Sequence, residues 1–496
     1  MTGVNDTLFR RLMANSASRG DGVAIRQKRF GIWHATTWRD WARRVRECAL
    51  GLRDDGLRPG DHVAIVAESR EEWLLAQLGV ALAGGIPVAP HVGAAFDMLA
   101  QQIVATGCVM AICEGQEQVD NMLLVRNQSP TLRRILTIEG RGLRDYEVAG
   151  LGDFTSVVER GAAILAADPA AAEALVDQCA ADALLLVSFT AGTTGAPKPV
   201  RQTHAAALAA ADALAALASL RTEAEIVSVL PLGHATEQAI SLHLATTIGA
   251  CVNFAESPRT MQDDIREIAP DVFVAPPRVW EGLHTQITVK IERSGPLRRN
   301  LLGRAFRRSS ATPQTSSSWA ARIWLAAYDL LVFRPLRDYL GLSRGGLLAC
   351  TGGMPALESL RFFRRLGLPV RNLYSVAEAG GVVAWPNSEQ DPAIVGHPLP
   401  LLGGKVDLEG TFQIGLSGAW FDSGDLAELE PAGLRIDGHS ADAAGGAAIE
   451  AMLRASPYIN QAMLTSDATG RPVLLAQVDA GAVGAWSEAR RLPYTT

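Results

Sequence analysis

The stretch over residues 183–220 constrains the fold of this chain more than any other. An apolar run over residues 183–189 leads into a loop that is rich in threonine and glycine and ends at Lys198. An alanine-rich segment with helical spacing follows. This order predicts a strand, a phosphate loop and a helix, as found in α/β proteins. A flexible surface turn is the alternative, since turns often have this composition.

The loop residues have the chemistry that a polyphosphate requires. Gly192 and Gly195 allow the backbone to approach a ligand closely, and Lys198 supplies a positive charge. Hydroxyl donors come from Thr190, Thr193 and Thr194. This is not a Walker loop, because too few residues separate its glycines and Pro199 follows the lysine. We therefore expect a phosphate loop of another type over residues 188–200.

The loop resembles the Thr-Ser-Gly-Thr-Thr-Gly-x-Pro-Lys-Gly-Val signature of the adenylate-forming superfamily. That superfamily includes acyl-CoA synthetases, peptide-synthetase adenylation domains and luciferases. Two positions differ: Ala191 stands where the family usually has serine, and Pro199 where it usually has glycine. The first difference removes a hydroxyl that the family directs at phosphate oxygens. The resemblance implies that residues 190–198 bind ATP.

Composition narrows the class of protein. With 496 residues, 48% of them hydrophobic, the chain can bury the cores of about two or three domains. Its formal net charge of −6 argues against nucleic acid as a partner. The six cysteines are scattered, which predicts reduced and mostly buried thiols. Because neither a signal-peptide pattern nor a long apolar run occurs, we expect a cytoplasmic protein.

Strand-like and helical segments alternate before the loop, which predicts an α/β layer. Strands are expected near residues 23–26, 63–66, 86–89, 109–113 and 135–138, and helices near residues 37–52, 72–83 and 96–106. After the loop, residues 205–220 predict a buried helix that covers the sheet.

A histidine and a glutamate follow the predicted strand over residues 226–230. His234 and Glu237 lie one helical turn apart at its carboxyl end, where α/β sheets bind ligands. A packed or solvated histidine is the alternative for His234. Residues 230–237 resemble the Pro-Leu-x-His-x-x-Glu segment of acyl-CoA synthetases. This resemblance implies that His234 lies beside the acyl carboxylate.

Two further segments bear on the branch of the family. Residues 273–281 are similar to the Val-Pro-Arg-Val-Trp-Glu signature of the long-chain branch, and they also predict a helix begun by proline with Trp280 in the core. Residues 290–308 form a basic amphipathic pattern, which predicts either a solvated face or peripheral membrane contact. The region at about 290–345 looks like the insertion of long-chain enzymes.

A diglycine and a second strand contribute the other half of the expected site. Gly352 and Gly353 follow an apolar strand, and residues 370–378 carry Tyr374 and Glu378. A tyrosine ring can stack on a purine, and a carboxylate can coordinate magnesium between phosphates. This stretch resembles the family's Tyr-Gly-x-Thr-Glu motif, which implies adenine contact for Tyr374 and Mg²⁺ binding for Glu378. The family threonine is replaced by alanine at position 377.

The last recognisable motif ends at Asp425. Residues 420–425 resemble Trp-x-x-Thr-Gly-Asp, whose aspartate accepts hydrogen bonds from both ribose hydroxyls, although Ser-Gly-Asp alone would indicate a turn. After Asp425 the resemblance to the family weakens. His439 stands where the family has a ribose-binding arginine, and Ala441 stands where the family has a lysine. A lysine that bridges carboxylate and α-phosphate in the family has no counterpart here.

The fold class that follows is α/β. We expect a large N-terminal AMP-binding body of several subdomains over residues 1–433 and a reduced α+β C-terminal domain over residues 434–496. The resemblance implies an AMP-forming acyl-CoA synthetase that uses ATP, Mg²⁺ and CoA to activate a fatty or aryl carboxylic acid. Its catalytic residues would be Lys198, His234 and Glu378. The alternatives are a pseudoenzyme that binds nucleotide or acyl ligand without turnover, and an enzyme that needs a C-terminal domain in trans.

Overall fold

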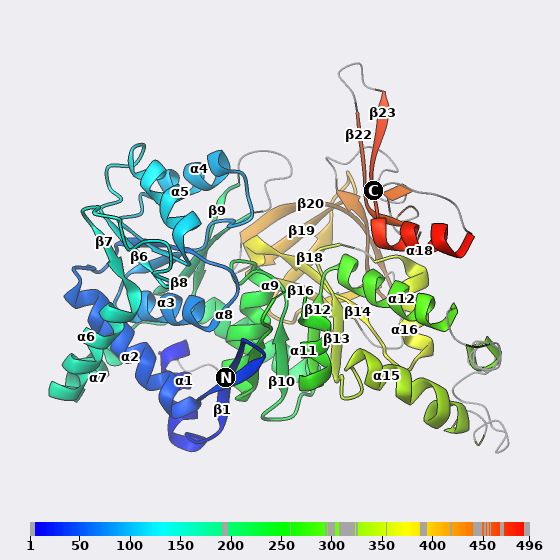
Figure 1. Ribbon diagram of the computed structural model, residues 1–496, viewed down its shortest axis with the longest axis horizontal. Coiled ribbons are helices and arrows are strands. Elements are labelled where there is room, and N and C mark those ends of the chain that lie inside the picture. Colours follow the sequence, from blue (N-terminus) through cyan, green and yellow to red (C-terminus); the bar gives the residue numbers. More distant parts are fainter. Residues whose placement is uncertain are drawn as a thin grey trace. The chain divides into compact units, whose positions relative to one another are not determined.

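The chain divides into two compact units (Figure 1). The first unit comprises Met1–Met261 and Ser375–Val382, and the second unit comprises Gln262–Tyr374 and Val383–Thr496. The computed structural model describes residues 5–190, 197–257, 259–292, 295, 303–306, 323, 326–353, 355–386, 394–416, 419–439, 449–450, 453, 456, 458–466 and 471–490.

The first unit contains a seven-stranded sheet in the order β7-β6-β5-β3-β4-β8-β9. Its strands are β3 His62–Val66, β4 Ile86–Val88, β5 Met110–Cys113, β6 Arg134–Thr137, β7 Leu151–Asp153, β8 Leu184–Phe189 and β9 Pro199–Thr203. All neighbouring pairs are parallel except β8 and β9, which pair antiparallel. The carboxyl ends of the parallel strands therefore share one edge, where ligands bind in α/β sheets.

Helices cover both faces of this sheet, with α4 and α5 on one face and α2, α3 and α6 on the other (Figure 1). Their bounds are α2 Trp38–Asp54, α3 Glu71–Leu82, α4 Phe96–Thr106, α5 Gln116–Arg126 and α6 Phe154–Ala167, and α7 Pro169–Gln178 follows them in the chain. Leu99 and Ile103 of α4 and Met122 of α5 form one buried cluster with Ala111 and Ile135 of the strands. The same cluster includes Val187 and Phe189 of β8, the strand that leads into the loop.

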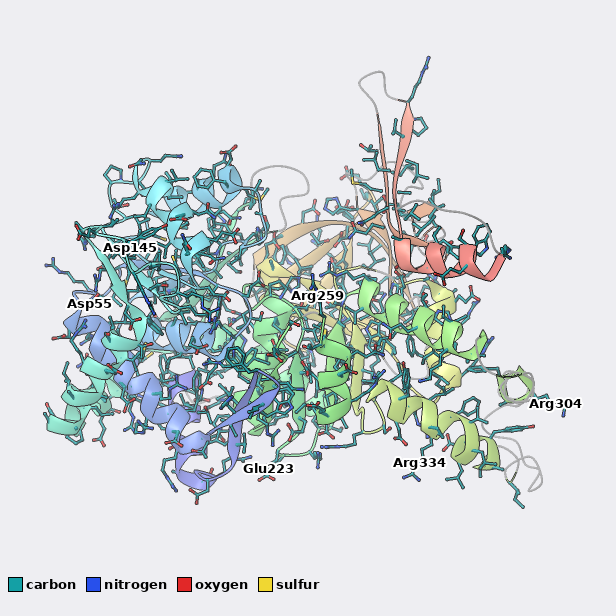
Figure 2. The ribbon with its side chains drawn as sticks, viewed as in Figure 1. Asp55, Asp145, Glu223, Arg259, Arg304 and Arg334 are labelled. Carbon is teal, nitrogen blue, oxygen red and sulfur yellow. The ribbon has the colours of Figure 1, made fainter. Side chains whose placement is uncertain are left out.

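Helices α2 and α6 pack backbone to backbone. A Cβ atom at Gly161 would lie 1.7 Å from the carbonyl oxygen of Glu47, and one at Gly51 would lie 2.0 Å from that of Val157. Asp55, labelled in Figure 2, accepts hydrogen bonds from Arg134 at 2.7 and 2.9 Å. The end of α2 is thereby tied to the sheet.

A second group of strands in the first unit runs in the order β10-β11-β1-β2. These are β10 Glu225–Ser228, β11 Cys251–Phe254, β1 Val23–Arg29 and β2 Ile32–Thr37, with β2 antiparallel to β1 and the other pairs parallel. The helical segments beside them are α1 Leu8–Ser18, α8 His204–Ala218, α9 Ala235–Glu237, η1 Gln238–Leu244 and α10 Ala245–Ile248. Segment η1 is a π-helix, a rare geometry that often marks functional sites.

In the second unit, β12 Val272–Ala275, β13 Leu347–Cys350 and β14 Arg371–Asn372 pair in parallel. Its helical segments are α11 Met261–Ile268, α12 Pro277–Glu292, η2 Asp329–Phe333, α15 Arg334–Leu340 and α16 Leu357–Arg365. Helix α12 begins at a proline, as predicted. The side chain of Trp280 is fully buried and donates to the carbonyl oxygen of Ala349 at 3.0 Å.

An antiparallel sheet in the second unit runs in the order β17-β21-β20-β19-β18. Its strands are β17 Ile394–Pro398, β18 Gly403–Val406, β19 Thr411–Leu416, β20 Ala419–Glu430 and β21 Gly433–His439. Strand β16 Gly381–Trp385 pairs with β17 through residues 384–385. Strands β22 Ile459–Ser466 and β23 Pro472–Val478 form a hairpin before α18 Ala480–Arg490. The domain boundary near residue 433 stays a prediction.

The alternating pattern before the loop predicts the elements well, and α4 spans the predicted residues 96–106. One expectation about the loop is wrong. Strand β9 comes between the loop and α8, because Pro199 and the residues after it pair antiparallel with β8 before the alanine-rich helix begins at His204. The loop is therefore closed by two paired strands.

Other expectations concern cysteine and the membrane. All six cysteines are free, and every one except the half-buried Cys179 is buried, as predicted. No helix among the described residues is long and apolar enough to cross a membrane. Of the basic pattern at 290–308, the structure describes only 290–292, 295 and 303–306. The proposed insertion at about 290–345 likewise lies partly outside the described residues.

Candidate functional site

The neck of the predicted phosphate loop is closed by two hydrogen bonds. The backbone N–H of Thr190 donates to the carbonyl oxygen of Lys198, and the N–H of Lys198 donates to Oγ1 of Thr190, both at 3.0 Å. The side chain of Lys198 is exposed, so its charge is available at the neck. The other predicted loop residues, Gly192, Thr193, Thr194 and Gly195, lie outside the described residues.

The segment that carries Glu378 is fixed against elements on both sides. Glu378 is exposed on η3 Ala377–Ala379, which follows β15 Tyr374–Val376. The side-chain amide of Gln202 on β9 donates to the carbonyl oxygen of Gly380 at 3.2 Å. A Cβ atom at Gly381 would lie 2.8 Å from the carbonyl oxygen of Ala235 on α9. The structure thus brings together the elements that carry Lys198, Glu378 and His234.

The turn that presents His234 is anchored by two polar side chains, those of the half-buried Ser69 and the buried Glu237. The hydroxyl of Ser69 donates to the carbonyl oxygen of Leu230 and accepts from the N–H of Leu232, each at 3.0 Å. The carboxyl group of Glu237 accepts from the N–H of Leu230 at 3.1 Å and from the hydroxyl of Ser241 at 2.5 Å. The turn is consequently held from both its ends.

Burial changes the acidity of Glu237. Its side chain is only 2% exposed, and desolvation raises its pKa from 4.5 to about 7. Hydrogen bonds from Ser241 and from the backbone of Leu230 oppose that shift without cancelling it. Near neutral pH, Glu237 is therefore present in both its protonated and its charged form.

A pair of buried glutamines continues the anchor. The amide of Gln238 donates to the carbonyl oxygen of Leu232 at 2.7 Å, and the amide of Gln77 donates to Oε1 of Gln238 at 2.9 Å. Both glutamines are fully buried. Gln238 opens the π-helix η1, so the irregular backbone begins directly behind the histidine turn.

His234 has a defined tautomer in this turn. The backbone N–H of Thr236 donates to its Nδ1 at 3.2 Å, so the neutral ring carries its proton on Nε2. Desolvation by the surrounding protein lowers the pKa of His234, and the nearby His91 lowers it further. The exposed ring can therefore donate an Nε2–H hydrogen bond to an anionic oxygen.

In the second unit, the structure brings together Tyr374, Asp425 and His439. The hydroxyl of Tyr374 donates to Oδ2 of Asp425 at 2.5 Å. Asp425 on β20 lies opposite His439 on β21. The ring of Tyr374 is only 8% exposed and packs edge-on against Phe412, so much of the face predicted to stack on a purine is covered. The predicted adenine and ribose roles stay predictions.

Gly352 and Gly353 form the predicted turn after β13. Their φ angles are +76° and +149°, which L side chains rarely adopt, and both residues are exposed. The sequence pattern of a strand that ends in a diglycine turn is confirmed.

The residues present fit a magnesium ion that is held mainly by its substrate. Among the described residues, no group of three or more His, Cys, Asp or Glu side chains could hold a metal ion by itself. Mg²⁺ usually binds one or two carboxylates together with phosphate oxygens and water. The exposed carboxylate of Glu378 suits that mode.

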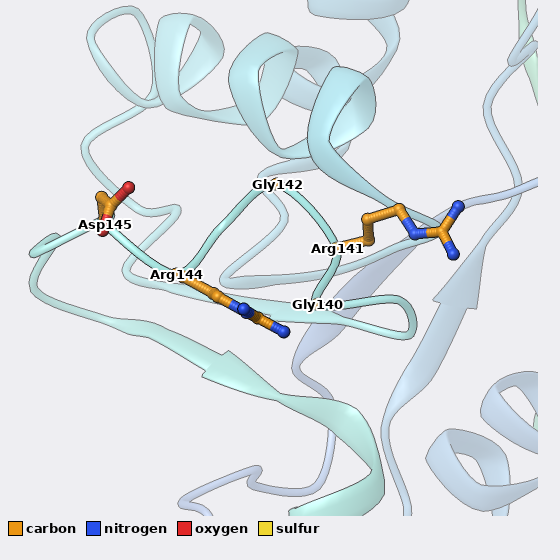
Figure 3. A pocket seen from close by; sticks show the side chains of 5 residues that line it. All are labelled: Gly140, Arg141, Gly142, Arg144 and Asp145. Atoms are coloured by element: carbon orange, nitrogen blue, oxygen red, sulfur yellow. The ribbon is translucent and has the colours of Figure 1, made fainter.

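A separate hollow of about 520 Å³ lies at the loop between β6 and β7 (Figure 3). It is lined by Gly140, Arg141, Gly142, Arg144 and Asp145, all of which are exposed. The predicted site residues do not line it, so we assign no ligand to it.

Sequence reasoning did not find the residues that support the site. Ser69, Gln77, Gln202 and Gln238 lie far from the motifs in sequence or carry no motif of their own. Glu237 is part of the segment that resembles Pro-Leu-x-His-x-x-Glu, but the spacing of that motif could not predict that its side chain is buried. A polar residue inside an otherwise apolar helix, such as Gln77 in α3, was the one available signal.

Comparisons with known proteins agree with this architecture. A family model described as AMP-binding enzyme matches residues 12–412. The long-chain-fatty-acid–CoA ligase FadD15 of Mycobacterium bovis is 25% identical over 98% of this chain and 84% of its own length. The solved structure of an anthranilate CoA ligase, AuaEII, in complex with anthranoyl-AMP covers 99% of this chain and 92% of its own with a TM-score of 0.70 at 14% identity. A long-chain-fatty-acid-CoA ligase (FadD1) from Archaeoglobus fulgidus covers 97% and 92%, with a TM-score of 0.65 at 14% identity. At these identities the solved structures show a shared fold.

Proposed function

The chain belongs to the AMP-binding enzyme family, and from that premise we propose that it is an AMP-forming acyl-CoA synthetase. It joins a fatty or aryl carboxylic acid to CoA through an acyl-adenylate. The relatives support this choice, because FadD15 is named as a long-chain-fatty-acid–CoA ligase and AuaEII was solved with an aryl adenylate. They favour the ligase over a binding protein without turnover.

One structural observation carries the proposal. A cation, an imidazole and a carboxylate lie on or beside three elements of the first unit, and the segment that carries the carboxylate contacts each of the other two elements. The Gln202 amide joins β9 to η3, and Gly381 brings η3 against α9. Adenylation needs little covalent chemistry from the enzyme beyond positioning and neutralising charge. The three exposed groups Lys198, His234 and Glu378 suit those tasks.

Each group has a distinct role in this proposal. Lys198 neutralises the phosphates at the loop neck, and the Nε2–H of His234 orients the acyl carboxylate. Glu378 holds Mg²⁺, which when bound withdraws charge from the phosphate oxygens. Asp425 accepts from the ribose hydroxyls, as the family motif implies. The membrane contact through residues 290–308 and the cytoplasmic location remain predictions.

The test measures pyrophosphate release by the purified chain with ATP, Mg²⁺ and a panel of carboxylic acids, with and without CoA. Lys198→Ala and Glu378→Gln should each reduce carboxylate-dependent release by roughly 10²–10³-fold, the range for a lost transition-state contact. Lys198→Arg keeps the charge, and Glu173→Ala removes an exposed carboxylate on α7 as a matched control.

Two outcomes are decisive. Carboxylate-dependent release that falls in the two variants but not in Glu173→Ala establishes adenylation. The absence of release, together with nucleotide or acyl binding by calorimetry, contradicts the ligase and leaves a binding protein.

A further inference from the structure

His91 lies beside the phosphate loop, although no motif points to it. It follows β4 by three residues, and β4 pairs with β8, the strand that leads into the loop. The N–H of Ala89 continues that pairing by donating to the carbonyl oxygen of Val187 at 2.8 Å. The ring centroids of His91 and Phe189, the last residue of β8, are 6.3 Å apart. His91 therefore flanks the point where the loop begins.

A single buried glutamine fixes the ring of His91. Oε1 of Gln102 on α4 accepts from the backbone N–H of His91 at 2.9 Å, and Gln102 is 2% exposed. Because a backbone N–H can only donate, this bond also fixes which end of the amide is oxygen. The amide nitrogen then lies 3.0 Å from Nδ1 of His91, and Nδ1 must accept. The neutral ring consequently carries its proton on Nε2, on the edge turned away from Gln102.

The same tautomer occurs at His234, in a turn that touches the His91 segment. The N–H of Thr236 donates to Nδ1 of His234 at 3.2 Å. A Cβ atom at Gly233 would lie 3.2 Å from Cβ of Ala89 and 3.9 Å from the carbonyl oxygen of Pro90. A charge on His91 also opposes a charge on His234. Two neighbouring imidazoles thus each have Nδ1 occupied and Nε2–H available.

We propose that His91 is a second imidazole donor of this site, and that its Nε2–H binds an anionic oxygen of the substrates beside His234. The proposal rests on the proposed function and deepens it. The oxygen belongs either to the acyl carboxylate or to a phosphate of ATP.

Three substitutions separate this role from a structural one. In His91→Gln the side-chain amide reaches the position of Nε2, whereas in His91→Asn it reaches only that of Nδ1. If Nε2–H binds substrate, kcat/KM should fall about tenfold to a hundredfold in His91→Ala and His91→Asn, the cost of one hydrogen bond to a charged group. His91→Gln should stay within about threefold of the unsubstituted chain.

A purely structural histidine gives the reverse order. His91→Asn would then keep the bond to Gln102 and remain active, while His91→Gln would lose activity and unfold at lower urea. That order, or equal activity in all three variants, overturns the proposal. The individual KM values identify the oxygen: a higher KM for ATP assigns a phosphate, and a higher KM for the carboxylic acid assigns the acyl carboxylate.

A second measurement does not depend on turnover. Nitrogen-15 NMR of the chain labelled at histidine reports the tautomer of His91, whose signal is assigned by its loss in His91→Gln. We expect the Nε2–H form, with shifts on addition of Mg·ATP or octanoate. An Nδ1–H form, or a signal that neither probe shifts, overturns the proposal. If no pyrophosphate is released at all, the proposed function fails on its own, and these spectra still decide the role of His91.

Discussion

The two units hold their expected site residues in different ways. In the first unit, His91 and His234 are backed by polar side chains that are almost fully buried, such as Gln102 and Glu237, each 2% exposed. In the second unit, Asp425 and His439 face each other across two strands and are only half-buried. A buried polar group is costly to leave without a partner, whereas water replaces a lost partner at a half-buried one. Substitutions behind the first set should therefore cost much more than substitutions around the second.

The largest expected effect is that of Glu237→Ala. The variant leaves the N–H of Leu230 and the hydroxyl of Ser241 without this acceptor and opens a cavity in a buried turn. We expect the free energy of unfolding at pH 5, measured with urea, to fall by about 3–5 kcal/mol. Glu237→Gln keeps an oxygen for Leu230 and an amide for Ser241, so it should lose about 1 kcal/mol. Equal losses in the two variants would mean that an amide cannot replace the carboxyl group in these hydrogen bonds, because Glu237→Gln retains the side-chain volume.

The pH dependence of stability tests the same carboxyl group. Burial raises the pKa of Glu237 from 4.5 to about 7, so between these values the folded chain holds a proton that the unfolded chain releases. The contribution of this proton to the free energy of unfolding is fully present below pH 4.5. It is lost as the pH rises through about 7, and the total loss is about 3 kcal/mol.

The control for this prediction is Glu237→Gln, which cannot titrate. The difference in unfolding free energy between the unsubstituted chain and Glu237→Gln should decline from pH 4.5 to pH 7 and level off above. This comparison removes the opposite trends of His204 and His243, whose pKa values burial lowers to about 4 and about 3. If this difference does not change with pH, Glu237 is already ionised in the folded chain between pH 4.5 and pH 7. A nearby cation would then be needed to neutralise the buried carboxylate.

Gly424 offers a smaller test in the second unit. Its φ angle is +75°, and a Cβ atom there would lie 2.6 Å from Nε2 of His439. Gly424→Ala should lower stability by about 1–2 kcal/mol and raise the KM for ATP, because His439 must move. Gly410→Ala has the same backbone strain at φ +83° with nothing within 4 Å, so it isolates the strain alone. If both variants have the same KM, the position of His439 does not matter for ATP.

The sequence predicted what local patterns and motifs determine. Apolar periodicity placed β3 to β6 and α4, and the motifs singled out Lys198, His234 and Glu378. Periodicity missed β9, since Pro199 and the following residues are too few to show alternation. It also could not reveal Gln102, which lies 11 residues from His91 and meets it only because α4 folds back over the sheet. Such supports depend on tertiary contacts that leave no local pattern. The binding roles themselves stay predictions.

The smallest effect is expected from Tyr374→Phe. This variant removes the hydroxyl that donates to Oδ2 of Asp425, while the ring and its edge-on contact with Phe412 remain. Because Asp425 is half-buried, water can replace the lost donor, and pairing with β21 still sets the position of the residue. We expect a loss of stability below about 1 kcal/mol and a rise of about threefold in the KM for ATP, with kcat unchanged. Asp425→Asn is the matched comparison, since it removes the charge and replaces one of the two acceptor oxygens with a donor, and it should raise that KM further. A loss in Tyr374→Phe as large as that in Glu237→Ala would break the contrast between the units, because a hydroxyl, and not strand register, would then hold Asp425 in place.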